Sequence, residues 1–247
     1  MPANRSLALV VRTVDVFETS LVVTLFTREL GKVAALAKGG RRLKSAFQGG
    51  LDLLGVSDIV LLPKASESLD LLTEAAPVER FSCLRRDLAA LYAGYYIAEL
   101  LTDLTDYHDP HPKLFDAARI TLRHLGDPGL RARRVLRFEL ACLREIGLMP
   151  LLDRCAHCGE PLGDEEAVAF GPATGGTLCP ACRPGQPHVI TASRRTIEGL
   201  QALATPGDAW REMGMSGSEL ATVRQTVGAV VSHVLGHRPR VWPFLGV

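Results

Sequence analysis

The sequence predicts an α+β, multidomain protein with an N-terminal β-barrel, an α-helical domain and an inserted four-cysteine module. Residues 1–80 are rich in short apolar, β-branched segments, whereas apolar residues recur at helical spacing from Cys83 onward. Two CxxC pairs interrupt the helical pattern. The expected domains are therefore the barrel at 1–80, the helical domain at 81–150 and 190–247, and the cysteine module at 151–189.

Composition restricts the class of protein only loosely. The chain has 247 residues, 47% of them hydrophobic and 22% charged, which suits one large domain or a few small ones. No apolar run approaches the ~20 residues that span a bilayer, and no secretory signal is visible, so we expect a cytoplasmic protein without a membrane role.

Charge is distributed in blocks that the formal net charge of +1 conceals. Residues 1–50 carry eight Lys/Arg against three Asp/Glu, 51–110 carry four against eleven, and 111–150 carry eight against four. Such blocks fit a basic surface that binds a polyanion, and they fit an uneven solvated surface equally well.

Five segments of the first eighty residues have strand character: Leu7–Val16, Leu21–Thr27, Val33–Ala37, Ser57–Leu62 and Leu69–Thr73. Short turns join the first three segments. Five short antiparallel strands fit a closed barrel, because closure removes the sheet edges. The five-stranded oligonucleotide-binding (OB) barrel is the natural candidate, although an SH3-like barrel has similar spacing.

The third and fourth strands are joined by a long basic connection at 38–50. Glycine pairs at both ends predict flexibility, and four of its residues are cationic: Lys38, Arg41, Arg42 and Lys44. Beside a barrel these cations could follow a phosphate backbone, or they could simply be solvated. Phe47 could stack on a base, but we favour an anchoring role in which its ring packs into the barrel.

Five helices are expected: Leu84–Leu101, Lys113–Leu125, Leu130–Ile146, one from about Ser193, and Glu219–Leu235. In the third helix Arg133, Arg137 and Arg144 share one face. That arginine stripe could contact phosphates, an acidic partner peptide or the acidic block at 51–110 of the same protein, and pairing within the protein ranks at least level with the others.

The strongest motif is Cys155-Ala-His-Cys158, a gap of twenty residues, and Cys179-Pro-Ala-Cys182. Two CxxC turns supply four thiolates, which select Zn²⁺ in a tetrahedral shell, with iron as the second choice. A shell of four cysteines has no vacant position, so the metal is expected to be structural. Redox-active or unliganded thiols are the alternatives, and the cysteine pairs alone would also fit a zinc-ribbon module that binds nucleic acid or protein.

No catalytic residues are predicted, and the chain is not expected to be an enzyme. Asp103, Asp106, His108, Asp109 and His111 could serve a metal-dependent nuclease, but they lie at a helix end before Pro110, where such residues cap helices and form turns. Phosphate-binding loops, dinucleotide turns and nucleophile elbows are absent from the sequence.

Short segments along nearly the whole chain, in order and spacing, resemble a known family. In the barrel they are Leu9-Val10-Val11-Arg12, Glu18-Thr19-Ser20-Leu21, Leu25-Phe26-Thr27, Gly31-Lys32-Val33 and Ala37-Lys38-Gly39. Farther on they are Tyr95-Tyr96-Ile97-Ala98-Glu99-Leu100, Pro112-Lys113-Leu114-Phe115, Arg137-Phe138-Glu139-Leu140, Ile146-Gly147-Leu148-Met149-Pro150 and Cys155-Ala156-His157-Cys158-Gly159. Together these segments resemble the bacterial recombination mediator family RecO.

The resemblance implies an OB barrel, a helical domain and a zinc-ribbon-like insertion. It also implies binding of single- and double-stranded DNA, annealing of complementary strands without ATP, and work with RecR, the single-stranded DNA-binding protein and, indirectly, RecA. Carried onto this chain, the DNA contacts are Arg12, Lys38, Arg41, Arg42 and Lys44, and the zinc ligands are Cys155, Cys158, Cys179 and Cys182. The tail departs from the family pattern, because Pro239, Trp242 and Pro243 replace an expected Lys-Ser ending.

Overall fold

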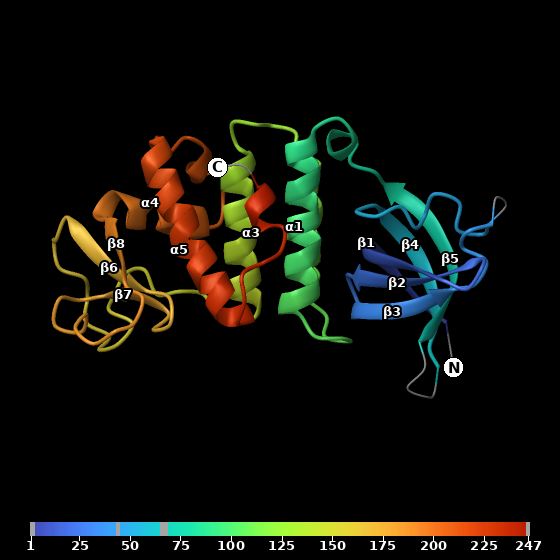
Figure 1. Cartoon of the computed structure of the whole chain (residues 1–247), viewed down its shortest axis with the longest axis horizontal. Helices are drawn as coiled ribbons and strands as arrows, with labels where there is room; N and C mark the ends of the chain where they lie inside the picture. Colours follow the sequence, from blue (N-terminus) through green and yellow to red (C-terminus); the bar gives the residue numbers. More distant parts are fainter. Residues whose placement is uncertain (1–2, 43–44, 65–68, 246–247) are drawn as a thin grey trace. The chain divides into compact units, whose positions relative to one another are not determined.

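The computed structural model describes residues 3–42, 45–64 and 69–245 (Figure 1). The chain divides into two compact units. Met1–Arg131 and Val241–Gly246 form the first, here called the barrel unit, and Ala132–Arg240 forms most of the second, here called the cysteine unit. Among the described residues no helix is long and apolar enough to cross a membrane.

The barrel consists of five strands: β1 (Asn4–Val16), β2 (Ser20–Thr27), β3 (Gly31–Ala37), β4 (Val56–Leu62) and β5 (Asp70–Glu79). They close in the order β1-β2-β3-β5-β4, and only the β3–β5 pair is parallel (Figure 1). The predicted five-stranded OB barrel is therefore confirmed. Alternate side chains of each strand point inward, so the core is lined by small and branched residues such as Ala8, Val10, Val23 and Ile59.

Phe47 packs into this barrel core with 6% of its surface exposed, as the anchoring interpretation predicts. The glycine pair that follows it, Gly49-Gly50, does more than make the connection flexible. Gly50 N–H donates to the Phe47 carbonyl, and a Cβ on Gly50 would lie 2.1 Å from the Ala75 carbonyl oxygen. At this position glycine allows the chain to approach β5 closely.

Strand β5 is longer than predicted, since it continues past Thr73 to Glu79. Proline in a strand cannot donate to the ladder, and Pro77 lies where the β4–β5 register shifts. The added residues carry Glu79 to helix α2 (Pro112–Arg123), where its carboxylate accepts from Arg119 Nε at 2.5 Å and Arg123 Nε at 2.7 Å.

The prediction that the first helix begins at Leu84 is wrong. Ser82–Arg85 is a 3₁₀ turn, and α1 (Leu88–Leu104) begins after the N-cap Asp87, whose carboxylate accepts from the amides of Ala89 and Ala90. The helical spacing of apolar residues therefore continues across the change from the 3₁₀ turn to α1, and Leu88 is 65% exposed.

A buried lysine of β3 holds the far end of α1. The Lys32 side chain is 6% exposed, and its ammonium donates to the carbonyls of Thr102 and Thr105. It also lies 4.7 Å from the centre of the Tyr107 ring. A cation at the carbonyl end of a helix is favourable, so Lys32 fixes α1 against the barrel.

The chain returns to the barrel unit after residue 240. Phe244 stacks on Tyr92 with ring centroids 5.1 Å apart, and Trp242 meets Tyr96 edge-on at 5.9 Å. The Val241 amide donates to the Glu99 carboxylate at 3.0 Å. The unusual residues of the tail thus pack on α1.

The cysteine unit contains three helices and a small sheet. The helices are α3 (Arg131–Glu145), α4 (Arg194–Ala204) and α5 (Gly217–Leu235), and the strands are β6 (Ala167–Gly171), β7 (Gly176–Leu178) and β8 (Ile190–Ser193). The strand order is β7-β6-β8, and all pairs are antiparallel. The sequence predicted the helices but not these three short strands.

Candidate metal centre and nucleic-acid interface

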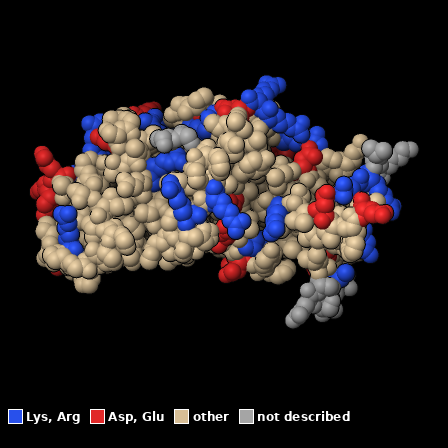
Figure 2. Space-filling model, viewed as in Figure 1, with Lys and Arg blue, Asp and Glu red and all other residues tan. Residues whose placement is uncertain are grey.

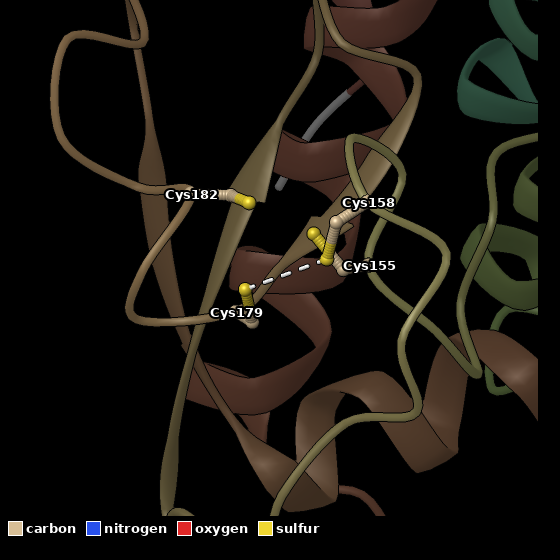
Figure 3. Close-up of side chains that lie close together, drawn as sticks. All are labelled: Cys155, Cys158, Cys179 and Cys182. Atoms are coloured by element: carbon tan, nitrogen blue, oxygen red, sulfur yellow. Dashed lines mark hydrogen bonds between the residues drawn. The ribbon is translucent and has the colours of Figure 1, made fainter.

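The two CxxC pairs form two turns that face each other in the cysteine unit (Figure 3). In the first turn the Gly159 amide donates to the Cys155 carbonyl at 2.9 Å, and Gly159 has φ +78°, which glycine adopts without strain. The second turn follows β7 directly, and both the Cys182 and Arg183 amides donate to the Cys179 carbonyl at 3.1 Å.

Thr177 on β7 connects the two turns. Its hydroxyl donates to the Arg154 carbonyl at 2.7 Å, and its own carbonyl accepts from the Ala156 amide at 2.7 Å. Thr177 is fully buried, so these contacts fix the first turn beside the strand that leads into the second. The contacts of Thr177 therefore position the two CxxC turns, and with them the four sulfurs, relative to each other.

The four sulfurs lie within 4.8 Å of one another, and the Cys158 and Cys179 sulfurs are 3.8 Å apart (Figure 3). A tetrahedral shell with metal–sulfur bonds of ~2.3 Å has sulfur–sulfur edges of ~3.8 Å. The residues thus fit a metal ion held by four thiolates. Among the described residues this is the one group of Cys, His, Asp and Glu with such geometry.

The surroundings of Cys155 and Cys182 shift the pKa values of these two thiols in opposite directions. Burial raises the pKa of Cys155, but backbone amides of Cys179, Cys158 and His157 outweigh it and lower that pKa to about 6. A hydrogen bond with Cys179, burial and neighbouring thiols raise the pKa of Cys182 to about 12. A thiolate at Cys155 provides a first ligand for a cation, and metal binding must displace the proton that Cys182 holds.

The cations predicted to bind DNA lie on the surface of the barrel unit. Arg12 on β1, Lys38 after β3, and Arg41 and Arg42 in the following turn are all exposed. Lys44 lies outside the described residues. On the face that Figure 2 shows, Lys and Arg side chains alternate with Asp and Glu over the barrel, so basic groups do not form an uninterrupted patch there.

A hydrogen bond and an ion pair join the basic turn to the β1–β2 hairpin. The Arg41 amide donates to the Thr19 carbonyl at 3.0 Å, while within the turn the Arg42 amide donates to the Gly39 carbonyl at 3.0 Å. The Arg41 guanidinium also lies 3.3 Å from the Asp15 carboxylate. Asp15 was not predicted from the sequence as a partner of the basic turn, although it lies just before the hairpin turn that contacts Arg41.

The arginine stripe of α3 is used within the cysteine unit. Arg137 donates to the carbonyls of Leu203 at 2.8 Å and Thr205 at 3.0 Å, and Arg144 donates to the Ala204 carbonyl. These carbonyls end α4, where cations are favoured. Arg133 donates to the Arg211 carbonyl as well, so the stripe pairs within the protein. Its hydrogen-bond partners among the described residues are these carbonyls and not the acidic block at 51–110.

The Asp and His residues at 103–111 lie in the last turn of α1 and in the connection to α2. His108 has φ +61° and its amide donates to the Lys32 carbonyl at 3.0 Å, while His111 pairs with Asp109 at 3.1 Å at the start of α2. They do not form a group of three or more metal-ligating atoms within the described residues.

Comparison with known proteins gives the same assignment for both parts of the chain. The family description "Recombination protein O N terminal" matches residues 1–81, and "Recombination protein O C terminal" matches residues 85–243. The chain is 45% identical over 200 residues to "DNA repair protein RecO" of Rhodopirellula baltica, covering 81% of this chain and 74% of that protein. It is 35% identical over 237 residues to the protein of that name from Anaeromyxobacter dehalogenans, covering 96% and 93%. The chain therefore belongs to the RecO family of DNA repair proteins.

Proposed function

We propose that this chain is a recombination mediator that binds single- and double-stranded DNA and anneals complementary strands without ATP. Arg12, Lys38, Arg41, Arg42 and Lys44 contact the phosphates. With RecR, the protein helps RecA to load on DNA covered by the single-stranded DNA-binding protein, in the cytoplasm at the nucleoid. The observation that carries this proposal is the exposed basic turn on an OB barrel in a chain of the RecO family.

The cations of the basic turn explain annealing without covalent chemistry. They neutralise phosphates on two strands, release counterions and reduce the repulsion between the strands. Base pairing then supplies the free energy, so the protein acts without being an enzyme. The four cysteines hold a structural Zn²⁺, for which Cys155, Cys158, Cys179 and Cys182 supply a complete shell.

Annealing of two labelled complementary oligonucleotides without ATP tests this proposal. Wild type should anneal them quickly at low salt, and Arg41→Glu/Arg42→Glu should lose the activity while remaining folded. A matched control is Arg86→Glu/Lys113→Glu, which makes the same change in charge at exposed residues elsewhere in the barrel unit. No annealing by wild type with metal retained, or equal loss in both double variants, would contradict the proposal.

A further inference from the structure

The β1–β2 hairpin exposes an aromatic ring at its tip. Phe17 is 81% exposed, the largest exposed fraction of any bulky apolar residue among the described residues. Its backbone has φ +57°, a left-handed conformation that bulky residues rarely adopt. Glycine or asparagine would form this turn with less strain, so folding does not explain a phenylalanine here.

The hairpin tip is physically joined to the basic turn. The Thr19 carbonyl accepts the Arg41 amide at 3.0 Å, and Asp15 pairs with the Arg41 side chain at 3.3 Å. On the other side of the same turn, a Cβ on Gly40 would lie 3.2 Å from the Leu21 side chain. Phe17 is thus held at a fixed place, two residues from the carbonyl that binds the basic turn.

We propose that Phe17 is a stacking platform for an unpaired base of single-stranded DNA. The inference rests on the proposed function, because it adds a base contact to the phosphate contacts of the basic turn. Exposed rings beside cationic grooves bind single strands in this way, since every base has a face on which a ring can stack. In a duplex the bases already stack on one another, so the ring should add little to the affinity for double-stranded DNA.

The charges around Phe17 favour a base over a phosphate at the tip. Asp15 and Glu18 flank the ring, and both carboxylates are exposed and repel phosphates. Lys38 directly follows Ala37, which pairs with Leu21 of β2, and Arg42 directly follows Arg41, whose amide binds Thr19. None of the hydrogen bonds or ion pairs of the described residues engages the Lys38 or Arg42 side chain, and both residues are exposed. A strand whose phosphates lie on these two cations would therefore pass close to the hairpin that carries Phe17.

Three variants of Phe17 test the stacking role by fluorescence anisotropy with a labelled single-stranded oligothymidine and a duplex of equal length. Phe17→Ala should weaken single-strand binding about tenfold, or ~1.4 kcal/mol, and leave duplex binding nearly unchanged. Phe17→Leu keeps apolar bulk without a π face and should behave like alanine. Phe17→Trp should retain the affinity of wild type, and the fluorescence of the introduced tryptophan should be quenched when the single strand binds.

A matched control is Ile120→Ala, which removes an exposed apolar side chain from α2, and it should leave both affinities unchanged. Equal single-strand affinity of wild type and Phe17→Ala would overturn the inference, as would an equal loss by Phe17→Ala on an oligonucleotide of abasic sites. Loss of RecR binding by Phe17→Ala with unchanged DNA binding would also overturn it and assign the ring to a protein partner. If wild type binds neither oligonucleotide, the proposed function itself fails.

Discussion

Replacing Asp15 by asparagine releases Arg41 from its ion pair without removing a cation from the barrel surface. The Arg41 and Asp15 side chains are 44% and 66% exposed, and an exposed pair of this kind contributes only about 0–1 kcal/mol to stability. The variant should therefore fold normally. Its effect should appear in nucleic-acid binding, where Arg41 becomes free to meet a phosphate.

The size of the effect follows from the number of free cations. In wild type Arg12, Lys38 and Arg42 make none of the side-chain hydrogen bonds or ion pairs found among the described residues, whereas Arg41 is paired. The other cations, Lys44 included, are the same in both proteins, so the difference between them comes from Arg41. Each phosphate neutralised on a single strand contributes about −0.7 to the slope of log K against log salt, so full release of Arg41 from Asp15 makes the slope steeper by up to about 0.7. Raising salt from about 50 to 200 mM should then weaken Asp15→Asn up to about 2.6-fold more than wild type.

Fluorescence anisotropy with a single-stranded oligonucleotide across this salt range measures both slopes. At low salt Asp15→Asn should bind more tightly than wild type. Asp116→Asn is a matched control, because it removes the same charge from another exposed ion pair, Arg28–Asp116 at 3.0 Å. An unchanged slope for Asp15→Asn, or an equal gain in both variants, would refute the assignment of Arg41 to phosphate binding.

Three further predictions concern the metal centre and the supports of the barrel. Cys158→Ser should lower the zinc content well below about one ion per chain, measured by atomic absorption, and should expose the amides of β6 and β7 to hydrogen exchange. Lys32→Met should destabilise the barrel unit by ~2–4 kcal/mol in urea unfolding, because two carbonyls of α1 lose a charged donor. Glu79→Gln should cost ~1–2 kcal/mol at pH 7 and much less at pH 3.

The pH dependence follows from the sign of the Glu79 shift. Burial raises its pKa, but hydrogen bonds from Arg123 and Arg119 outweigh burial and lower the pKa below its usual value. A carboxyl group with a lowered folded-state pKa stabilises the protein above its unfolded pKa of ~4.3, and this stabilisation is lost as pH falls through the folded value. A difference between Glu79→Gln and wild type that stays constant from pH 7 to pH 3 would contradict this.

The predictions for Cys158→Ser and Lys32→Met each have a control variant. Cys83→Ser replaces a cysteine outside the tetrad and should keep the full zinc content, so equal metal loss in both cysteine variants would count against the four-thiolate site. Lys32→Arg should retain part of the stability of wild type, since a charged donor remains near the carbonyls of α1.

The sequence was most informative where one physical pattern determined the structure. Period-two apolar segments predicted all five barrel strands, and the two CxxC pairs predicted which sulfurs would meet. These patterns are local, because alternation reflects the pleat of each strand and a CxxC turn presents two ligands by itself. The cysteine tetrad could thus be predicted from spacing alone.

Features that depend on packing were harder to predict. Leu84 and Leu88 keep a helical period, but the Asp87 side chain caps the following amides and separates a 3₁₀ turn from α1. The fifth strand was predicted to end at Thr73, but β5 continues through Pro77 to Glu79, because a register shift that accommodates proline depends on the partner strand. The three strands of the cysteine unit are too short for alternation to distinguish them from loops.

The partners of charged side chains could not be predicted from the sequence either. Helical spacing placed Arg137 and Arg144 on one face, but only the fold shows that this face meets the end of α4. Likewise the cations of the basic connection look equivalent in sequence, whereas among those that the structure describes Arg41 alone is paired, with Asp15. Tertiary contacts decide which charges remain free for a ligand.

The burial of Phe47 links the turn proposed to contact phosphates to the barrel interior. The hydrogen bond from the Arg41 amide to Thr19 holds the start of the connection, and the buried ring holds its end. The entropy of ordering Arg41 and Phe47 is therefore lost when the barrel folds, and less remains to be lost when a ligand binds. A core substitution that loosens Phe47 would thus weaken nucleic-acid binding without changing a single charge.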